Sequence, residues 1–392
     1  MPLPTPAGLY IHFPFCRRRC HYCDFNTYVV DVIPVESYTS AVIRELETRS
    51  ESLDGAEIAS VFLGGGTPGL WGPEPVRRVL EAVESLFGSS TSREITIEVN
   101  PGECDETMLT AYREVSGCNR VSLGVQSLTD SLLVAMDRIH GADEARAAMR
   151  AVVEAGYEDW SADLIFGLPG QDLRGWLADL EEVLSYDSPH LSVYNLMVEE
   201  ATPLYTMVRR GSVVLPAEEI QLDMLLQARE RIEAAGLKRY EISNFARPGH
   251  GSRHNSLYWT GRPYLGIGAG AHGFVPDGRP GILGRREANV RKFVPYMEAI
   301  ARDGSAIHSS EDIAPTVHVR ERMMMGLRLE KGVDLAEVAA VTGIDPAVVM
   351  GTSLAALAAE DFLVFEGSVV RLTERGLPVS DAVFLRLFEA AA

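Results

Sequence analysis

Residues 10–23 read YIHFPFCRRRCHYC, in which a short strand-forming run leads directly into three closely spaced cysteines. Cys16, Cys20 and Cys23 give the pattern CxxxCxxC. The aromatic and β-branched residues before the first cysteine favour a strand. The arginines and the histidine between the cysteines are typical of a loop rather than of a buried core, where free cysteines otherwise gather. We therefore expect a strand followed by a loop that carries ligands.

The rest of the first 240 residues repeats a unit in which a short apolar run is followed by an amphipathic stretch. We expect strands at 9–13, 60–63, 94–99, 121–125, 162–166 and 191–196, and helices at 35–50, 75–87, 130–155 and 174–184. This alternation predicts an α/β fold with a parallel sheet, and its period fits a barrel of βα units. Because the carboxyl ends of barrel strands build the active site, we expect the chemistry at one mouth.

The pattern changes after residue 240, so we expect three parts, 1–240, 241–312 and 313–392. In the second part the loops grow richer in glycine and aromatic residues. In the third, helices at 319–329, 334–341 and 347–360 are followed by two short strands at 362–365 and 369–372 and by a last helix. Helices that precede a two-stranded ribbon predict a small helical domain of winged-helix-like layout.

The composition narrows the classes of function. The chain has 392 residues and a formal net charge of −19, which disfavours nucleic acid as a partner because phosphate backbones would be repelled. No basic and apolar leader or long apolar run stands out, so we expect a cytoplasmic protein without an integral membrane segment. The five cysteines are an odd number, which favours reduced thiols over a disulfide framework.

The three clustered cysteines predict a metal centre. Three soft thiolates on one loop suit a 4Fe-4S cluster whose fourth iron lacks a protein ligand and can bind an external molecule. Zinc is the alternative metal, but structural zinc sites use four ligands, and Cys104 and Cys118 stand alone in the sequence. We expect His21 to pack or to support the loop rather than to bind metal.

The CxxxCxxC pattern after a strand, together with GGGTP at 64–68, resembles the radical S-adenosylmethionine superfamily. The segments YIHFPFC (10–16), NRVSLGVQS (119–127), DLIFGLPGQ (163–171) and YEISNF (240–245) resemble the oxygen-independent coproporphyrinogen III oxidases and their paralogues, the HemW heme chaperones. This resemblance covers nearly the whole chain. It implies a partial (β/α)6 TIM-like barrel in residues 1–240, with S-adenosylmethionine bound to the open iron.

The same resemblance implies the residues that hold S-adenosylmethionine. One molecule would contact Tyr10, Gly65, Glu98 and Arg138, with Arg138 as the partner of its carboxylate and Gly65, Gly66 and Thr67 around its amino group. Tyr22, Gly66, Thr67, Gln126, Asp163 and Met197 match positions that hold a second molecule in the coproporphyrinogen enzyme, and whether that second site persists is open. We expect Glu98, Gln126 and Asp163 at strand ends and Arg138 on the helix after the fourth strand.

Two features separate an enzyme from a heme carrier. The coproporphyrinogen enzyme has a further cysteine two residues after the third, where this chain has Phe25, which cannot form a thiyl radical or bind metal. Residues 254–259 read HNSLYW, which resembles the HNxxYW motif associated with heme binding in the chaperones. Imidazole and phenolate both serve as heme ligands, so His254 is the first candidate for the axial ligand and Tyr258 the second.

The sequence therefore predicts a heme chaperone that binds heme and a SAM-coordinated 4Fe-4S cluster and transfers the heme to an acceptor protein. The alternative is the radical decarboxylation of coproporphyrinogen III, and no catalytic residue is assigned. An electron donor such as a flavodoxin or a ferredoxin is implied. The arginines Arg17, Arg18 and Arg19 are interpreted either as a solvated face or as a docking point for that acidic donor.

Overall fold

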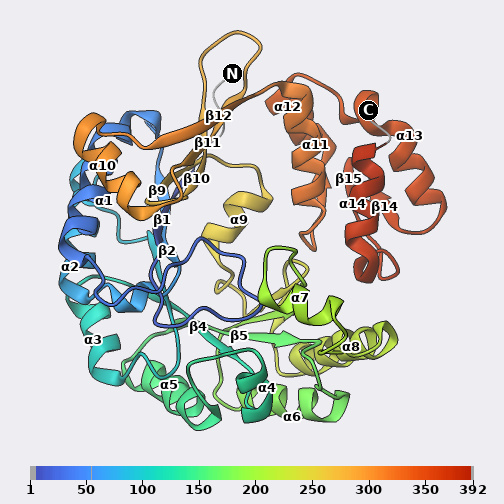
Figure 1. Ribbon diagram of the computed structural model, residues 1–392. Coiled ribbons are helices and arrows are strands. Elements are labelled where there is room, and N and C mark those ends of the chain that lie inside the picture. The colour runs from blue at the N-terminus through green and yellow to red at the C-terminus, as the bar shows by residue number, and fades with distance from the viewer. Residues whose placement is uncertain (1–5, 54, 390–392) are drawn as a thin grey trace.

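The computed structural model describes residues 6–53 and 55–389, so the expectations for residues 1–5 and 390–392 lie outside it. Its main sheet contains six parallel strands in the order of the chain, and the sheet curves around a central space (Figure 1). These are β1 (Ala7–Phe13), β2 (Ile58–Gly65), β3 (Glu94–Val99), β4 (Arg120–Gln126), β5 (Asp159–Phe166) and β6 (His190–Asn195). The fold is the partial (β/α)6 barrel that the sequence predicted.

Helices cover the outside of this sheet. They are α1 (Val35–Arg49), α2 (Pro73–Phe87), α3 (Glu106–Glu114), α5 (Ala142–Glu154), α6 (Leu173–Leu184) and α8 (Glu218–Ala234), with the short α7 (Pro203–Arg209) near the mouth. Helix α2 buries Val76, Val79, Leu80 and Val83, which recur at the spacing of one helical face. The strands are buried on both sides, which explains their near-continuous apolar runs.

The predicted helix 130–155 was wrong as one element, because the chain breaks into α4 (Asp130–Ala135) and α5. Asp137 adopts a left-handed backbone with a φ of 56°, which ends the first helix. The Asp130 carboxylate accepts the Ala142 N–H at 2.7 Å, and the Glu144 carboxylate accepts the Gly141 N–H at 2.8 Å, so both acids cap the start of the second helix. Arg138 consequently lies in the loop between them and not on a helix.

The strands between residues 238 and 313 extend the sheet at both edges, so this part begins and ends slightly outside the expected bounds 241–312. On one side β9 (Tyr264–Ile267) pairs in parallel with β1, and β10 (His272–Pro276), β11 (Gly284–Asn289) and β12 (Ile307–Ile313) continue it in antiparallel order, with α10 (Phe293–Asp303) between the last two. On the other side β8 (Asn244–Ala246) joins β6 and β7 (Lys238–Arg239) in antiparallel order. The extension therefore widens the barrel wall.

The short helix α9 (Arg253–Trp259) closes the barrel at the amino-terminal ends of its strands. The carboxylate of Glu94, at the start of β3, accepts the backbone N–H groups of Arg253 and His254 at 2.9 and 3.0 Å. A side chain at Gly8, near the start of β1, would collide with Leu257 at 2.8 Å. Helix α9 is thus the floor of the barrel, opposite the cysteine loop.

The last part of the chain packs around a hydrophobic core of its own, to which Val319, Leu354 and Leu387 contribute. It contains α11 (Pro315–Gly326), α12 (Leu335–Thr342), α13 (Pro346–Ala359), α14 (Ser380–Glu389) and the ribbon of β14 (Leu363–Glu366) and β15 (Val369–Leu372). The helices and the ribbon agree with the sequence, whereas the two-residue strand β13 (Val333–Asp334) beside β15 was not expected. In the described part of the chain no helix is both long and apolar enough to cross a membrane.

Candidate functional site

One cavity of about 990 Å³ extends from the mouth of the barrel to its floor. Every residue that the sequence assigned to a cofactor or a metal lines it, with the exception of His254. The lining residues among them are Tyr10, Cys16, Cys20, Tyr22, Cys23, Gly65, Gly66, Thr67, Glu98, Gln126, Arg138, Asp163, Met197 and Tyr258. Residues from the cysteine loop and from the sheet extension therefore meet around one space.

The three cysteines lie half-buried in the loop after β1 and are free thiols. The hydroxyl of Thr67 donates to the Sγ of Cys16 at 3.5 Å, and Nη1 of Arg138 donates to the Sγ of Cys20 at 3.4 Å. Burial raises the pKa of the Cys16 thiol to about 12, so a bound cation is needed to make the thiolate at neutral pH. Donors aimed at the sulfurs fit a bound iron–sulfur cluster, whose potential such hydrogen bonds tune.

The spacing of the thiols bears on the choice of metal. Between residues 6 and 53 and between 55 and 389, no three His, Cys, Asp or Glu side chains are gathered as a single metal ion would require. A four-iron cluster takes one thiolate at each of three separate irons, so its ligands stand further apart than those of one zinc ion. The choice between the cluster and the zinc alternative stays a prediction from the sequence.

Arg138 connects the cysteine loop to the strand ends. Besides Cys20 it donates to the Tyr22 hydroxyl at 3.3 Å, to the Asn100 side chain at 2.8 Å and to the Gly124 carbonyl at 2.9 Å. Its Nε is buried and has no hydrogen-bond partner among the described residues. A guanidinium that lines the cavity and keeps one unpaired N–H has donor capacity left for a carboxylate, the partner that the resemblance implied for this residue.

The glycine loop after β2 approaches the cysteine loop closely. Gly65 has a φ of 114°, and a side chain there would overlap the ring of His12 at 2.3 Å. A side chain at Gly66 would meet the Phe15 carbonyl oxygen at 2.5 Å. Only glycine fits at these positions, which explains the run of glycines without any phosphate-binding role.

Two half-buried carboxylates line the cavity. Burial and the nearby negative Asp163 raise the pKa of Glu98 to about 7, although Glu98 accepts the Gly65 N–H at 2.9 Å. Burial also raises the pKa of Asp163, which accepts the hydroxyls of Ser122 and Ser161 at 2.5 and 2.6 Å. The expectation that Asp163 sits at a strand end was wrong, because it lies within β5. Its side chain points to the inside of the barrel, between those of the neighbouring strands.

Gln126 ends β4 in a strained conformation. Its φ of 66° is rare for a residue with a side chain. Strained backbone conformations of this kind cluster at functional sites. Met197 is 64% exposed at the rim of the cavity, where a methionine with a packing role alone would be covered. The resemblance assigned both residues to a second S-adenosylmethionine, and that second site stays a prediction.

The HNxxYW segment forms helix α9 and therefore the floor of the cavity. His254 is 1% exposed, with Nδ1 hydrogen-bonded to the Ser60 hydroxyl at 2.9 Å and Nε2 to the Tyr258 hydroxyl at 2.7 Å. Neither ring nitrogen has a lone pair free for iron in this arrangement. Burial raises the pKa of Tyr258 well above its usual value, which disfavours the phenolate. An axial ligand in this motif stays a prediction and requires these contacts to break.

Several cavity residues were missed by the sequence reasoning. Asn100 joins the Arg138 side chain to the Thr67 hydroxyl, to which it donates at 2.9 Å. Its place after β3 and before a proline was a signal for a residue at the mouth. Others that line the same space include His190, His272 and Arg291, which no motif marked, and Ser122, which lies in the segment 119–127 but was given no role.

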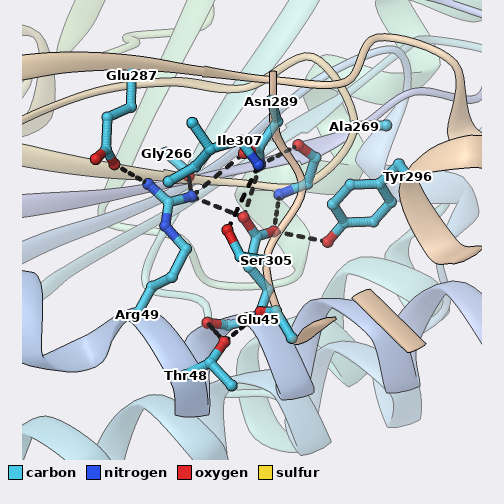
Figure 2. A network of polar contacts seen from close by, with 12 residues as sticks. Glu45, Thr48, Arg49, Gly266, Ala269, Glu287, Asn289, Tyr296, Ser305 and Ile307 are labelled. Atoms are coloured by element: carbon cyan, nitrogen blue, oxygen red, sulfur yellow. Dashed lines mark hydrogen bonds and ion pairs between the residues drawn. The ribbon is translucent and has the colours of Figure 1, made fainter. Parts of the chain in front are cut away.

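A buried polar network supports the cysteine loop from outside the cavity (Figure 2). Glu45 on α1 accepts the N–H of Gly268 at 2.9 Å, the Tyr296 hydroxyl at 2.7 Å and the Asn289 amide at 2.7 Å, and it pairs with Arg49 at 2.7 Å. Gly268 opens the loop after β9. The side chain of Asn26, beside the last cysteine, donates to Ala269 in that loop at 2.9 Å. The network thus fixes the wall against which the cysteine loop rests.

Comparisons with known proteins identify the family. A model of the radical SAM superfamily matches residues 10–183, and a model of the HemN C-terminal domain matches residues 313–379. The chain is 34% identical over 376 residues to a protein of Bacillus subtilis named heme chaperone HemW, covering 96% of this chain and 97% of that protein. The HemW of Escherichia coli is 34% identical over 342 residues, with 86% and 87% covered.

Two further similarities agree with this. A mouse protein named radical S-adenosyl methionine domain-containing protein 1, mitochondrial, is 36% identical over 335 residues, covering 84% of this chain and 74% of that protein. Among solved structures, the coproporphyrinogen III oxidase HemN of Escherichia coli matches with a TM-score of 0.81 at 21% identity, over 97% of this chain and 90% of that chain. At that identity the match shows the fold alone. From the family models and the full-length relatives, the chain belongs to the radical SAM superfamily and, within it, to the HemW family.

Proposed function

We propose that this chain is a heme chaperone: it binds heme beside a 4Fe-4S cluster and passes the heme to an acceptor protein. Cys16, Cys20 and Cys23 would hold three irons of the cluster, and S-adenosylmethionine would bind the fourth. When bound, the cluster supplies an electron to its ligand. The Arg138 guanidinium would orient the carboxylate of that ligand, and Glu98 would accept hydrogen bonds from ribose hydroxyls.

The observation that carries the proposal is Phe25. Its ring is 59% exposed and lines the cavity mouth, at the position where the coproporphyrinogen enzyme has a further cysteine. An exposed aromatic ring at the rim of a mixed polar and apolar cavity fits a planar apolar ligand better than water. The names of the full-length relatives point to the same function.

The second candidate is the decarboxylation of a coproporphyrinogen propionate. It is favoured by the continuous cavity beneath the cysteines, which is large enough for a tetrapyrrole substrate as well as for a heme. Against it stands the missing thiol at Phe25. Both candidates share the cluster and the S-adenosylmethionine site, so only their behaviour toward the tetrapyrrole separates them.

The test compares two tetrapyrroles on one anaerobic preparation with a full cluster. We expect heme to bind in a stoichiometric titration and to move to an apo-cytochrome acceptor when that protein is added. We expect no decarboxylated product when coproporphyrinogen III, S-adenosylmethionine and dithionite are supplied together. Product at many turnovers would establish the decarboxylase instead, and a protein that binds no heme would end the chaperone proposal.

A further inference from the structure

Three imidazole rings line the cavity, and two of them are fully engaged. His12 accepts the Tyr10 hydroxyl at Nδ1 at 2.8 Å and donates from Nε2 to the Asn26 carbonyl at 2.9 Å. His190 is hydrogen-bonded at Nδ1 to Ser161 and at Nε2 to Tyr240, both at 2.9 Å. With both nitrogens occupied, neither ring can bind iron without losing a buried hydrogen bond.

His272 differs from both. It opens β10 at the end of the barrel that carries the cysteine loop, and it is exposed to the cavity. Among residues 6–53 and 55–389 its ring nitrogens have no hydrogen-bond partner. Partial burial and the positive charges of Arg291 and Arg286 lower the pKa of its ring. A neutral, accessible imidazole is the form that ligates metal.

The residues near His272 could contact the porphyrin plane and a propionate of a heme. Asn26 donates to the carbonyl oxygens of Ala269 and Arg291, each at 2.9 Å, which ties the cysteine loop to the two segments that flank His272. Asn26 follows Phe25 directly, so the exposed ring of Phe25 and the exposed guanidinium of Arg291 belong to the same side of the mouth. An aromatic face suits the porphyrin plane, and a guanidinium suits a propionate.

We infer that His272 is the axial ligand of a heme bound at the cavity mouth, with Phe25 against the porphyrin and Arg291 at a propionate. This inference rests on the proposed heme-binding function. A ring nitrogen donates its lone pair to the heme iron and displaces a solvent ligand, with no change in the oxidation state of the iron. Ligation by His272 places the heme on the cluster side of the barrel, whereas ligation by His254 would place the heme at the floor.

The experiment is an anaerobic titration with ferric heme, followed by the Soret band and by EPR, on the wild type and on the variants His272→Ala, His272→Gln and His254→Ala. His308→Ala, which changes an exposed histidine outside the cavity, is the matched control. We expect both His272 variants to shift the Soret band and to weaken heme binding at least about tenfold. Loss of a residue that only supports a metal ligand already lowers metal affinity by about this factor. Added imidazole should restore the spectrum of His272→Ala.

Cluster content and the response of the cluster EPR signal to S-adenosylmethionine serve as the folding check for each variant. A wild type that binds heme while both His272 variants keep its spectrum and affinity would overturn the inference. Loss of ligation in His254→Ala alone would do the same and would support the floor site. A wild type that binds no heme would instead refute the proposed function, so the two failures are distinguishable.

Discussion

Arg138 shows how one side chain can organise a cofactor site. Its two terminal nitrogens make four hydrogen bonds, to Cys20, Tyr22, Asn100 and Gly124, while its buried Nε has no hydrogen-bond partner among the described residues. A planar guanidinium holds five N–H donors in a rigid fork, whereas an ammonium group has three rotatable donors on a flexible stem. The same residue thereby sets the position of a thiolate and offers a donor to a ligand carboxylate.

The first prediction is that three cysteines are the ligands of the 4Fe-4S cluster. Replacing Cys16, Cys20 or Cys23 with alanine should each abolish a stable 4Fe-4S cluster, because two thiolates remain for three irons. Iron and sulfide analysis after anaerobic reconstitution measures this. Cys104→Ala and Cys118→Ala are the controls and should keep full iron content, since neither residue lines the cavity. Full cluster content in Cys20→Ala, or one zinc per chain, would contradict the assignment.

The raised pKa of Glu98 predicts a pH dependence for S-adenosylmethionine binding. Hydroxyl donors of the ribose favour the carboxylate, so binding should strengthen as pH rises through about 7, where Glu98 ionises. Affinity at pH 6 should be about tenfold weaker than at pH 8, as expected when one proton must leave a group with this pKa. Equilibrium dialysis across this range measures it.

Glu98→Gln is the control for this prediction, because the amide stays neutral. Its affinity should be flat across the same pH range. The stability of the protein without ligand should change with pH in the opposite direction to the affinity. Because the pKa of Glu98 is higher in the folded protein than the value of about 4.3 in the unfolded chain, its contribution to stability falls as pH rises from about 4 to 7. A wild type whose affinity does not change with pH would exclude Glu98 as the hydroxyl acceptor.

At the level of elements, the network around Glu45 ties helix α1 to the sheet extension (Figure 2). The carboxylate is fully buried and pairs with Arg49, which also pairs with Glu287 at 2.6 Å. Residues from α1, β11 and α10 thus share one buried set of charges and hydrogen bonds. Such sets are costly to break, because the remaining partner keeps an uncompensated charge.

Glu45→Ala should therefore destabilise the protein by about 3–5 kcal/mol, the usual cost of removing one partner from a buried ion pair. Chemical denaturation of the cluster-free protein measures the loss. Glu47→Ala on the exposed face of the same helix is the matched control and should change stability by less than about 0.5 kcal/mol. Equal stability of the two variants would show that the network contributes little.

The elements also show what the sequence could predict. The six strands were predictable because strands covered on both faces require apolar runs, as in residues 60–63 and 121–125. The break between α4 and α5 was not, because the apolar spacing continues through it and the break depends on the backbone of Asp137 and on two capping carboxylates. The place of Arg138 followed from that break, so its side-chain contacts could not be predicted.

On the scale of the whole molecule, the site is assembled from distant segments. The cysteine loop, the loop that carries Arg138 and the segments around His272 and Arg291 lie more than a hundred residues apart, and they meet only at the barrel mouth. Residues in a motif, such as the cysteines, were predictable as a group. His272 and the floor position of His254 were not, because both follow from how the extension packs against the barrel.

The distribution of charge over the molecule leads to a prediction about where an electron donor docks to reduce the cluster. The chain carries a net charge of −19, yet three arginines occupy the cysteine loop. Arg17 and Arg18 have side chains that are 63% and 52% exposed, even though each pairs with an acid at 3.5 and 3.3 Å. A local positive patch on an acidic protein can steer an acidic donor to one place. The docking interpretation of these arginines therefore makes a prediction that the solvated-face interpretation does not.

Arg18→Glu should accordingly slow cluster reduction by an acidic flavodoxin at least about tenfold at low ionic strength, the smaller end of electrostatic steering effects. The effect should shrink as salt screens the charges, and reduction by dithionite should change little because so small a reductant needs no docking surface. Stopped-flow absorbance of the cluster follows both reactions. Arg302→Glu makes the same change in net charge on α10, where the side chain is 71% exposed and lies outside the cavity lining. If it slows the flavodoxin reaction as much as Arg18→Glu, only the net charge matters, and if neither variant slows it, the arginines form a solvated face.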